Sequence, residues 1–194
     1  MPRLVRPAIT SLADSHQPSI RVGGTSSLRP WKLTDAEAVI DAYEDAAIQR
    51  WHVRQIGSIA EAQELITGWQ DGWNAERACH WAFVDDADDL LLGRVALSSI
   101  NLQDGHAGVA YWMVPAARGR GLCTNAVIAA SEWAFREAGF HRLALEHSID
   151  NPASARVAIK AGFAAEGVRR GAALHADGWH DMCVHSRLAT DQTL

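Results

Sequence analysis

The sequence predicts an α+β fold, a single domain in which helices flank a mixed β-sheet. Segments that alternate like strands occur both before and after segments with helical periodicity, which favours a sheet with helices on its faces. A chain of 194 residues, 48% of them hydrophobic, is long enough to bury one extensive core. We expect this domain to span residues 19–194. Residues 1–18 contain three prolines, and we expect them to form a flexible N-terminal arm.

The first half of the chain is expected to supply one strand, two helices and three further strands. The spacings of Thr34 to Glu37 and of Ser58 to Glu61 match capping boxes, so a helix should begin at each. A run of five residues, four of them aspartate, predicts the turn between two of the strands. The expected ranges are strands over 25–29, 79–84, 90–100 and 106–114, and helices over 34–49 and 58–73.

The second half is expected to alternate helices with strands and to close on a hairpin. Asn151 is a preferred N-cap, and Pro152 suits the first position of a helix. The pair Asp177-Gly178 is typical of a two-residue hairpin turn. The expected elements are a helix from Leu122 that Gly139 ends, a helix from Pro152 that Gly162 ends, and strands over 142–149, 163–175 and 179–188.

Composition argues against several classes of protein. The formal net charge of -5 disfavours a general nucleic-acid-binding surface, and no apolar run is long enough to span a membrane. The three cysteines are widely spaced and odd in number, which favours a reducing compartment and hence the cytoplasm. None of the nine histidines falls in a metal-binding pattern, so we expect no metal.

The most informative segment is the glycine-containing loop at residues 114–122, between a predicted strand and a predicted helix. Such a loop presents backbone N–H groups at a helix N-terminus, where the partial positive charge favours phosphate. Gly119 and Gly121 would let the backbone approach a ligand closely, and two arginines supply positive charge. The alternative is an ordinary surface loop. A Rossmann fingerprint is excluded because Thr124 stands where its third glycine is needed.

Two motifs resemble those of a known family. Residues 118–123, Arg-x-x-Gly-x-Cys, are similar to the pyrophosphate signature of the GNAT superfamily of N-acetyltransferases, with cysteine at the last small position. Residues 151–163 resemble the Asn-x-x-Ser…Gly-Phe segment of the RimJ/RimL group, the ribosomal-protein N-terminal acetyltransferases and their small-molecule relatives. Residues 28–31 and 110–112 fit the same group. The resemblance therefore covers nearly all of the chain after the arm.

The resemblance implies a GNAT-like splayed sheet whose gap holds acetyl-CoA. It implies transfer of the acetyl group to a primary amine, either a protein N-terminus or a small molecule. The backbone around Met113 and Val114 would pair with the pantetheine arm, and an N–H near Met113 would stabilise the oxyanion. Asn151 would reach the arm from the other side. The residues so assigned to the cofactor are Met113, Val114, Arg118, Gly119, Arg120, Gly121, Leu122, Thr124, Asn151 and Ser154.

The resemblance to the family is less complete for the residues that move protons. Ala158 stands where many members have a tyrosine beside the sulfur, and Ala173 where RimL-like enzymes have a glutamate. Ser154 falls on the RimL-like serine, so its hydroxyl is expected to hydrogen-bond the leaving thiolate, although serine is also common at helix starts. Among the residues themselves, His147 is a candidate catalytic base. The alternatives are that His147 only packs in the core, that the neighbouring Glu146 is the base, or that a water chain is.

The acceptor side is marked by aromatic residues. Trp51 and Trp73 are expected to form an aromatic wall near the substrate amine, with plain core packing as the alternative. Two other interpretations of function stay open. The same scaffold could transfer another acyl group such as succinyl, or it could bind coenzyme A without turnover as a regulatory module. The sequence is also compatible with a homodimer.

Overall fold

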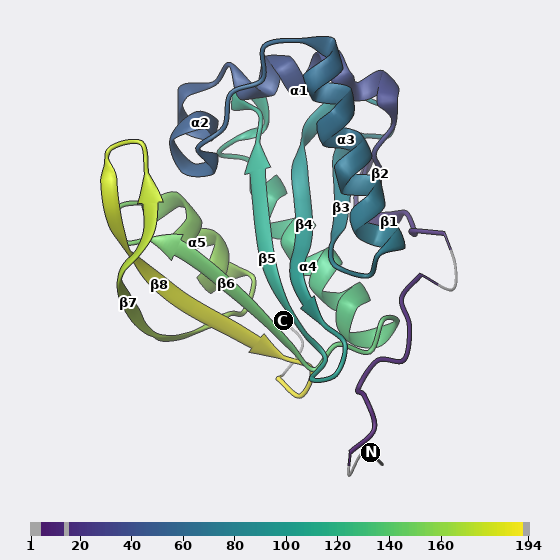
Figure 1. Ribbon diagram of the computed structural model, residues 1–194, viewed down its shortest axis with the longest axis vertical. Helices are drawn as coiled ribbons and strands as arrows, with labels where there is room; N and C mark the ends of the chain where they lie inside the picture. The colour runs from purple at the N-terminus through teal and green to yellow at the C-terminus, as the bar shows by residue number, and fades with distance from the viewer. Residues whose placement is uncertain (1–4, 14–15, 192–194) are drawn as a thin grey trace.

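A mixed β-sheet runs through the centre of the molecule (Figure 1). The computed structural model describes residues 5–13 and 16–191, and within them the strands follow the order β1-β2-β3-β4-β5-β6-β8-β7. β5 and β6 are parallel, and the other neighbouring strands are antiparallel. The strands are β1 (Ile20–Gly23), β2 (Ser26–Pro30), β3 (Cys79–Asp85), β4 (Leu91–Asn101), β5 (His106–Met113), β6 (Arg142–Ser148), β7 (Ala164–His175) and β8 (Gly178–Leu188).

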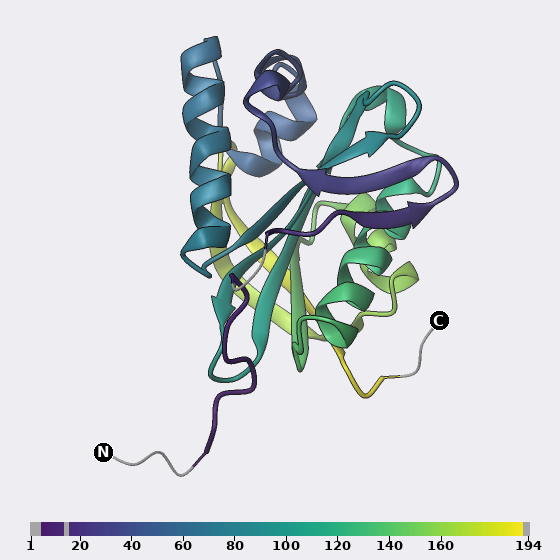
Figure 2. The ribbon, with the colours of Figure 1, turned by 90° about the vertical axis from the view of Figure 1, so that its right-hand side faces the viewer.

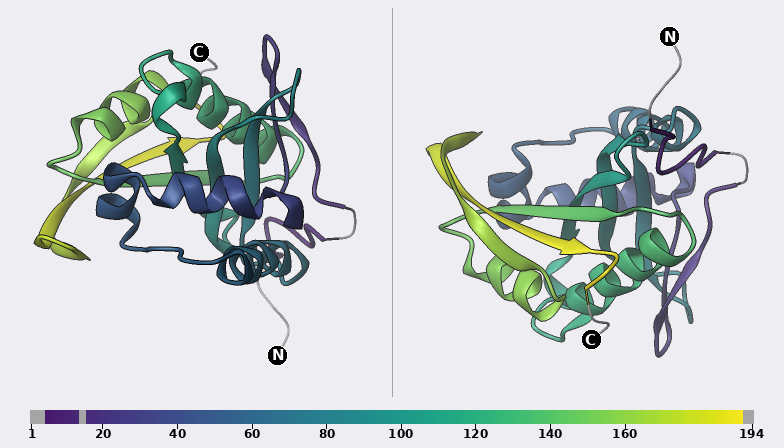
Figure 3. Two further views of the ribbon diagram at one scale, coloured as in Figure 1. Left: turned by 90° about the horizontal axis from the view of Figure 1, so that it is seen from above. Right: turned by 90° about the horizontal axis from the view of Figure 1, so that it is seen from below.

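Helices cover both faces of this sheet, which confirms the predicted α+β fold. α1, α2 and α3 lie on one face and α4 and α5 on the other, as the turned views show (Figures 2 and 3). Alternation along β3 divides the core accordingly: Trp81 and Phe83 pack in a cluster shared with α4, and Ala82 and Val84 in one shared with α1 and α3. The helices are α1 (Ala36–Tyr43), α2 (Ala46–His52), α3 (Ile59–Asn74), α4 (Leu122–Arg136) and α5 (Pro152–Lys160).

The parallel pair at the centre of the sheet is only partly paired. The register of β5 against β6 runs from His106↔Arg142 to Val109↔Leu145 and then stops. Beyond that point the two strands diverge, and β6 continues toward the β7–β8 hairpin (Figure 1). The predicted splay is therefore confirmed, and it leaves one edge of β5 without a strand partner.

The chain before α3 differs from the prediction, because β1 was not predicted and the first helix has other bounds. The helix expected over residues 34–49 is split into α1 and α2, because Asp45 adopts an extended conformation and caps α2 by accepting from Ile48 N–H at 3.0 Å. The capping box at Thr34 is not formed; α1 follows a short 3-10 turn, and the Asp35 carboxylate accepts instead from the Lys32 N–H at 2.8 Å. The capping serine before α3 is confirmed, since Ser58 Oγ accepts from the Glu61 N–H at 3.2 Å.

The N-terminal segment also differs from the flexible arm that its prolines suggested. Residues 1–4 and 14–15 lie outside the described residues. Between them, Ile9 and Leu12 are only 5% and 8% exposed and belong to the core cluster shared with α4. The Glu76 carboxylate accepts from the backbone N–H groups of Leu12 and Ala13, at 2.5 and 3.1 Å. Apolar burial and these hydrogen bonds anchor this part of the segment; the domain limit at residue 19 stays a prediction.

Three further observations apply to all of the residues that the structure describes. No helix within the described ranges is long and apolar enough to cross a membrane. Cys79, Cys123 and Cys183 are free thiols. The described residues contain no group of three or more histidine, cysteine, aspartate or glutamate side chains placed to hold a metal ion.

Candidate active site

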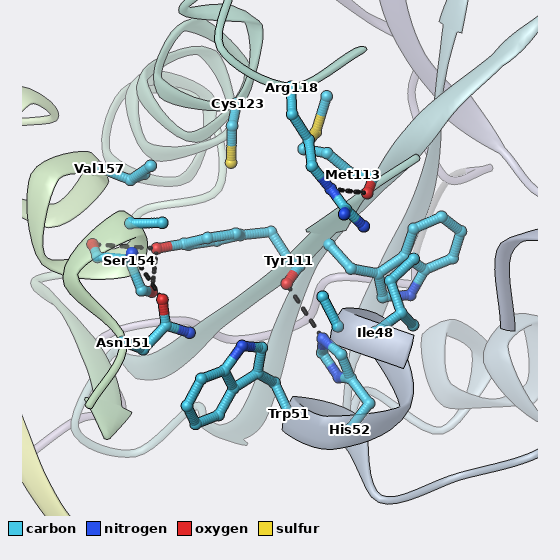
Figure 4. A pocket seen from close by; sticks show the side chains of 13 residues that line it. Ile48, Trp51, His52, Tyr111, Met113, Arg118, Cys123, Asn151, Ser154 and Val157 are labelled. Carbon is cyan, nitrogen blue, oxygen red and sulfur yellow. Dashed lines mark hydrogen bonds between the residues drawn. The ribbon is translucent and has the colours of Figure 1, made fainter. Parts of the chain in front are cut away.

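A cavity of about 340 Å³ lies at the end of β5, beyond the point where β5 and β6 stop pairing (Figure 4). We call it the larger cavity. Its walls come from α2, the end of β5, the loop and helix that follow β5, and the start of α5. Its lining side chains include Ile48, Trp51, His52, Tyr111, Met113, Arg118, Cys123, Asn151, Ser154 and Val157.

A smaller cavity of about 240 Å³ adjoins the larger one. The two share five lining residues, namely Trp51, His52, Tyr111, Asn151 and Ser154. The remaining walls of the smaller cavity come from β5, from the end of β6 and from the β7–β8 hairpin, among them Glu146, His147, Ser148, His175 and Met182. These five residues therefore form a wall that the two cavities have in common.

Tyr111 and Ser154 meet at the boundary between the cavities. The capping prediction for α5 is confirmed, because Asn151 Oδ1 accepts from the Ser154 N–H at 3.0 Å. This cap fixes the first turn of α5, and Ser154 Oγ lies 2.6 Å from Tyr111 Oη. Burial raises the pKa of Tyr111 above its usual range, against a smaller opposing effect of the Ser154 hydrogen bond, so the phenol stays protonated near neutral pH.

Sequence reasoning missed Tyr111 as a functional residue. The signal was available in the alternation of β5, which places Tyr111 on the face of Val109 and Met113, toward α4 and α5. Ala158, at the position where many family members have a tyrosine, is fully buried in the core. The phenol beside Ser154 thus comes from a strand rather than from the helix.

The loop after β5 has the backbone that its glycines suggested. Gly119 and Gly121 have φ of 75° and 77°, in the left-handed region that favours glycine, and Gly121 caps α4. Leu122 and Thr124 lie in the first turn of α4, where N–H groups have no acceptor within the helix. Arg120 is exposed on the same loop. These predicted cofactor residues therefore lie together at a helix N-terminus.

Arg118 has a different position from the one expected. Its Nε donates to the Met113 carbonyl at 3.0 Å, and its Nη2 contacts Asp45 Oδ1 at 2.6 Å. The hydrogen bond from Arg118 lowers the pKa of Asp45 and keeps that carboxylate ionised. Arg118 thus ties the loop to β5 and α2 at the wall of the larger cavity.

Met113 and Val114 were both predicted to pair with the pantetheine arm through their backbone groups, but only Met113 turns its N–H toward the gap. Val114 N–H donates to Leu92 O at 3.0 Å, and Val114 O accepts from Ala117 N at 3.0 Å, so Val114 is engaged within the protein. Because antiparallel ladder bonds alternate, Met113 and Tyr111 turn their N–H groups away from β4, toward the gap. Met113 therefore fits its predicted place, and Val114 does not.

His52 lines both cavities and was not singled out by sequence. Its Nε2 lies 3.2 Å from the Tyr111 carbonyl. Burial, and then the nearby Arg94 charge, lower the pKa of His52 to about 4. The imidazole is thus neutral at pH 7, and its Nε2–H donates to the carbonyl.

His147 lies at the smaller cavity, but its ring is engaged. The ring stacks on His185 with centroids 5.1 Å apart. Its Nδ1 lies 2.8 Å from the Ser148 carbonyl and its Nε2 lies 3.2 Å from His185 Nε2. Ile149, two residues further along the chain, is 51% exposed and adds no buried apolar wall beside the ring. This geometry does not favour a base role for His147.

The two tryptophans predicted to form the acceptor wall are far apart in the fold. Trp51 lines both cavities and packs edge-on against His175, with ring centroids 5.5 Å apart. Trp73 is 6% exposed and packs in the core against Trp133, with centroids 6.4 Å apart. The structure thus corrects the assignment of Trp73, because its position on α3 directs the ring into the core cluster.

Comparisons with known proteins agree with this geometry. Residues 27–164 match the model of the acetyltransferase (GNAT) domain. A probable N-acetyltransferase of Bacillus subtilis (strain 168), YjcK, is 30% identical over 158 residues, which cover 76% of this chain and 85% of that protein.

Two solved structures show the same fold. One is RimL, a ribosomal L7/L12 alpha-N-protein acetyltransferase in complex with coenzyme A, with a TM-score of 0.81 and 20% identity over 88% of this chain and 98% of that one. The other is the microcin C7 self-immunity acetyltransferase MccE in complex with acetyl-CoA and AMP, with a TM-score of 0.77 and 21% identity over 86% and 94%. The chain belongs to the GNAT acetyltransferase family and is an acetyl-CoA-dependent N-acetyltransferase.

Proposed function

We propose that the larger cavity holds the thioester end of acetyl-CoA and that the smaller cavity admits the accepting primary amine. The observation that carries this proposal is the shared boundary of the two cavities, which includes Tyr111 and Ser154. An amine in the smaller cavity would reach the thioester without either molecule leaving the protein. Such positioning lowers the barrier because it removes the entropic cost of bringing the reactants together.

The loop from Arg118 to Thr124 would hold the pyrophosphate of the cofactor. The first-turn N–H groups of α4 and the positive end of the helix dipole favour phosphate there. The left-handed φ of Gly119 and Gly121 supports a close backbone approach. Arg118 would act by holding the loop to Met113 O and Asp45, while the exposed Arg120 would supply charge to the phosphates.

The reaction would use the groups at the boundary. The Met113 N–H, which faces the gap, would donate to the oxygen that becomes negative in the tetrahedral intermediate. Ser154 would hydrogen-bond the leaving thiolate, and the Tyr111 phenol 2.6 Å away would donate to Ser154 Oγ and thereby supply the proton. The raised pKa of Tyr111 keeps the phenol protonated, so it can donate a hydrogen bond to Ser154 Oγ.

The acceptor would be a small-molecule amine or the N-terminus of a peptide, with the indole of Trp51 as one wall of its site. The names of the relatives support both classes, since RimL acts on a ribosomal protein and MccE is a self-immunity acetyltransferase. Membership of the RimJ/RimL-like group and a cytoplasmic location are part of the same proposal. A homodimer stays an open prediction.

A thiol-release assay with acetyl-CoA and a panel of amines tests the proposal. The panel pairs peptides that have a free N-terminus with the same peptides acetylated at that end, and adds small primary amines with their dimethylated counterparts. We expect release with at least one free amine and none with its blocked partner. A parallel series with succinyl-CoA examines the acyl group. Tight binding of coenzyme A without release on any amine would instead support a silent binding module.

A further inference from the structure

A chain of hydrogen-bonded side chains leads away from the smaller cavity. None of its members has a role in the reaction as described above. It starts at Ser148, which ends β6 and lines the cavity. Ser148 Oγ lies 2.7 Å from His180 Nδ1, and His180 Nε2 lies 2.8 Å from Asp177 Oδ1. Ser148 and His180 are 2% and 7% exposed, so both are buried, whereas Asp177 stands at the exposed hairpin turn.

The chemistry of the three groups fixes the direction of these bonds. An ionised carboxylate can only accept, so the proton on the neutral imidazole lies on Nε2 and points to Asp177. His180 Nδ1 then carries the lone pair and accepts from the Ser148 hydroxyl. Ser148 Oγ also accepts from the Asp150 N–H at 3.1 Å, which leaves one lone pair for a donor in the cavity.

The surroundings of His180 come from four other parts of the chain. Asp177 precedes β8, and its other oxygen pairs with Arg50 of α2 at 2.8 Å. Asp150, after β6, places Oδ2 3.6 Å from His180 Nδ1. The rings of His175 on β7 and Trp51 on α2 lie with centroids 4.6 and 6.0 Å from that of His180. Two carboxylates thus face the two ring nitrogens of His180.

We propose that Ser148 and His180 form the base of the transfer, with Asp177 as the positioning residue; this rests on the proposed function. The ammonium group of the acceptor donates to Ser148 Oγ, Ser148 passes its own proton to His180 Nδ1, and the amine becomes neutral. The amine nitrogen attacks the thioester carbonyl, the C–S bond breaks, and the second amine proton goes to the thiolate through Ser154 and Tyr111. His180 then returns its proton to solvent at the hairpin surface.

This assignment separates His180 from the three histidines that line the cavity, of which His175 has its Nδ1 3.2 Å from the Arg50 carbonyl. His147 has both ring nitrogens in contact with protein atoms, and His52 donates its Nε2–H to the Tyr111 carbonyl. His180 is connected to the cavity through a hydroxyl that lines it and to a carboxylate on its other side. The same connectivity of hydroxyl, imidazole and carboxylate is used by enzymes in which histidine takes a proton from serine.

The test is the pH dependence of turnover with saturating acetyl-CoA and the best amine of the panel. The variants are His180→Gln, Ser148→Ala and Asp177→Asn, with His147→Gln as the competing base and the exposed His16→Gln as control. Ionisation of the amine is common to all of them, so a limb present in the parent and missing in a variant belongs to the protein. Thermal unfolding and coenzyme A affinity check that each variant is folded.

We expect the rising limb near neutrality to vanish in His180→Gln and in Ser148→Ala, with turnover at pH 7 lower by about a hundredfold. Asp177→Asn should keep a limb at shifted pH and lose about tenfold. The Ser148→Ala/His180→Gln double variant should be no slower than either single variant, because the two act in one path. A limb that survives in His180→Gln, or that vanishes only in His147→Gln, would overturn the proposal.

Failure of the proposed function is a separate result. A protein that releases no thiol with any amine contradicts the proposed function, whatever the histidines do. The hydrogen-bond chain is then tested by nitrogen NMR of the histidine rings in the folded protein. We expect the Nε2-protonated tautomer of His180. We also expect Ser148→Ala to change the proton exchange and the nitrogen chemical shifts of this ring. The Nδ1-protonated tautomer, or a His180 ring that Ser148→Ala leaves unaltered, would contradict the chain.

Discussion

The two cavities meet at Tyr111 and Ser154, yet they are built from different kinds of structure. The larger cavity takes its walls mainly from elements of the core: Met113, 7% exposed, packs in the cluster shared with α4 and α5, and Trp112, 4% exposed, packs in the cluster shared with α1 and α3. Of the two, only the smaller cavity takes walls from the β7–β8 hairpin, and α2, which lines both cavities, lies beside that hairpin (Figure 1). The first nine residues of β7 are all exposed, so the hairpin is supported mainly by its own pairing with β8.

This difference matches what each cavity would bind. A cofactor common to every turnover needs one fixed geometry, and core elements supply it because their side chains cannot move without disturbing the packing. Side chains on an exposed hairpin can change at little cost to the core, which suits the part of a site that selects the acceptor. The comparison predicts that variants at the cavity boundary lower turnover, that variants in the loop weaken the cofactor, and that variants at the hairpin act on the amine.

The largest effect is expected at the boundary itself. Ser154→Ala should lower turnover about a hundredfold while the dissociation constant of acetyl-CoA changes little, because the lost hydroxyl acts on the thiolate that forms during the reaction. Tyr111→Phe, which keeps the ring and removes only Oη, should lower turnover by a similar factor. Steady-state kinetics and calorimetric binding of acetyl-CoA measure the two quantities.

The matched control for the boundary is Ser19→Ala, which removes the same hydroxyl from an exposed position. It should leave both turnover and cofactor affinity unchanged. Equal turnover in Ser154→Ala and the parent would reduce Ser154 to a helix-start residue. A loss in Tyr111→Phe that appears mainly as weaker cofactor binding would make the phenol a packing group instead.

The parts of the site that could be predicted from the sequence are those built from local motifs. The loop before α4 and the Asn151 cap were predictable because each is a local motif whose residues lie within a few positions of one another. Trp73 was misassigned because helical spacing places it beside Trp69 but does not say which cluster the ring enters. The contacts of Asp177 with Arg50 and of His180 with Trp51 were not predictable, since they join α2 to a hairpin more than 120 residues later in the chain.

A second prediction concerns the loop, where the effect should be about tenfold. Gly121 has φ of 77° and nothing within 4 Å of an added Cβ, so Gly121→Ala costs backbone strain rather than a clash within the protein. Strain of about 1–2 kcal/mol, or relaxation away from the left-handed conformation, would displace the first-turn N–H groups of α4. Calorimetry should therefore show acetyl-CoA affinity lower by about tenfold.

Gly24→Ala provides the matched control for this strain. Gly24 lies in the β1–β2 turn with φ of 58° and also has nothing within 4 Å of an added Cβ. Its alanine variant should lose a similar amount of thermal stability and keep full cofactor affinity. Equal loss of affinity in both variants would show that general destabilisation, rather than the loop, controls binding.

The third prediction uses pH to compare the two sides of the sheet. Burial, followed by the Arg94 charge, lowers the pKa of His52 to about 4 and that of His80 to about 3, from 6.5 in each case. The unfolded chain therefore binds protons below pH 6.5 that the folded chain excludes, so stability falls as the pH drops from 6.5 toward 4. At pH 5.5 the loss should be at most about 1 kcal/mol for each histidine.

Urea unfolding at pH 7.0 and 5.5 measures this loss. His52→Gln and His80→Gln should each flatten the dependence of the unfolding midpoint on pH, whereas the exposed His16→Gln should leave it unchanged. His52 lies on α2 and the ring of His80 stacks on that of Trp69 of α3, so acid should first weaken the side of the molecule that these helices cover. An unaltered pH dependence in both variants would assign the acid sensitivity to other groups.

The smallest effect is expected where α2 meets the hairpin. Arg50 pairs with Asp177 at 2.8 Å, with both side chains about half exposed, and its guanidinium lies 4.5 Å from the Trp51 ring centre. Exposed ion pairs contribute about 0.2–1 kcal/mol, so Arg50→Met should raise the KM for the amine only about two- to fourfold and leave that for acetyl-CoA unchanged. Added salt should raise the parent's KM toward the variant's value.

Arg21→Met, which breaks the exposed pair of Arg21 with Asp86 on the β1 side, is the control and should alter neither constant. If Arg50→Met shifted the KM for acetyl-CoA as strongly as that for the amine, the two cavities would be coupled through α2, and their separation into a cofactor side and an acceptor side would not hold.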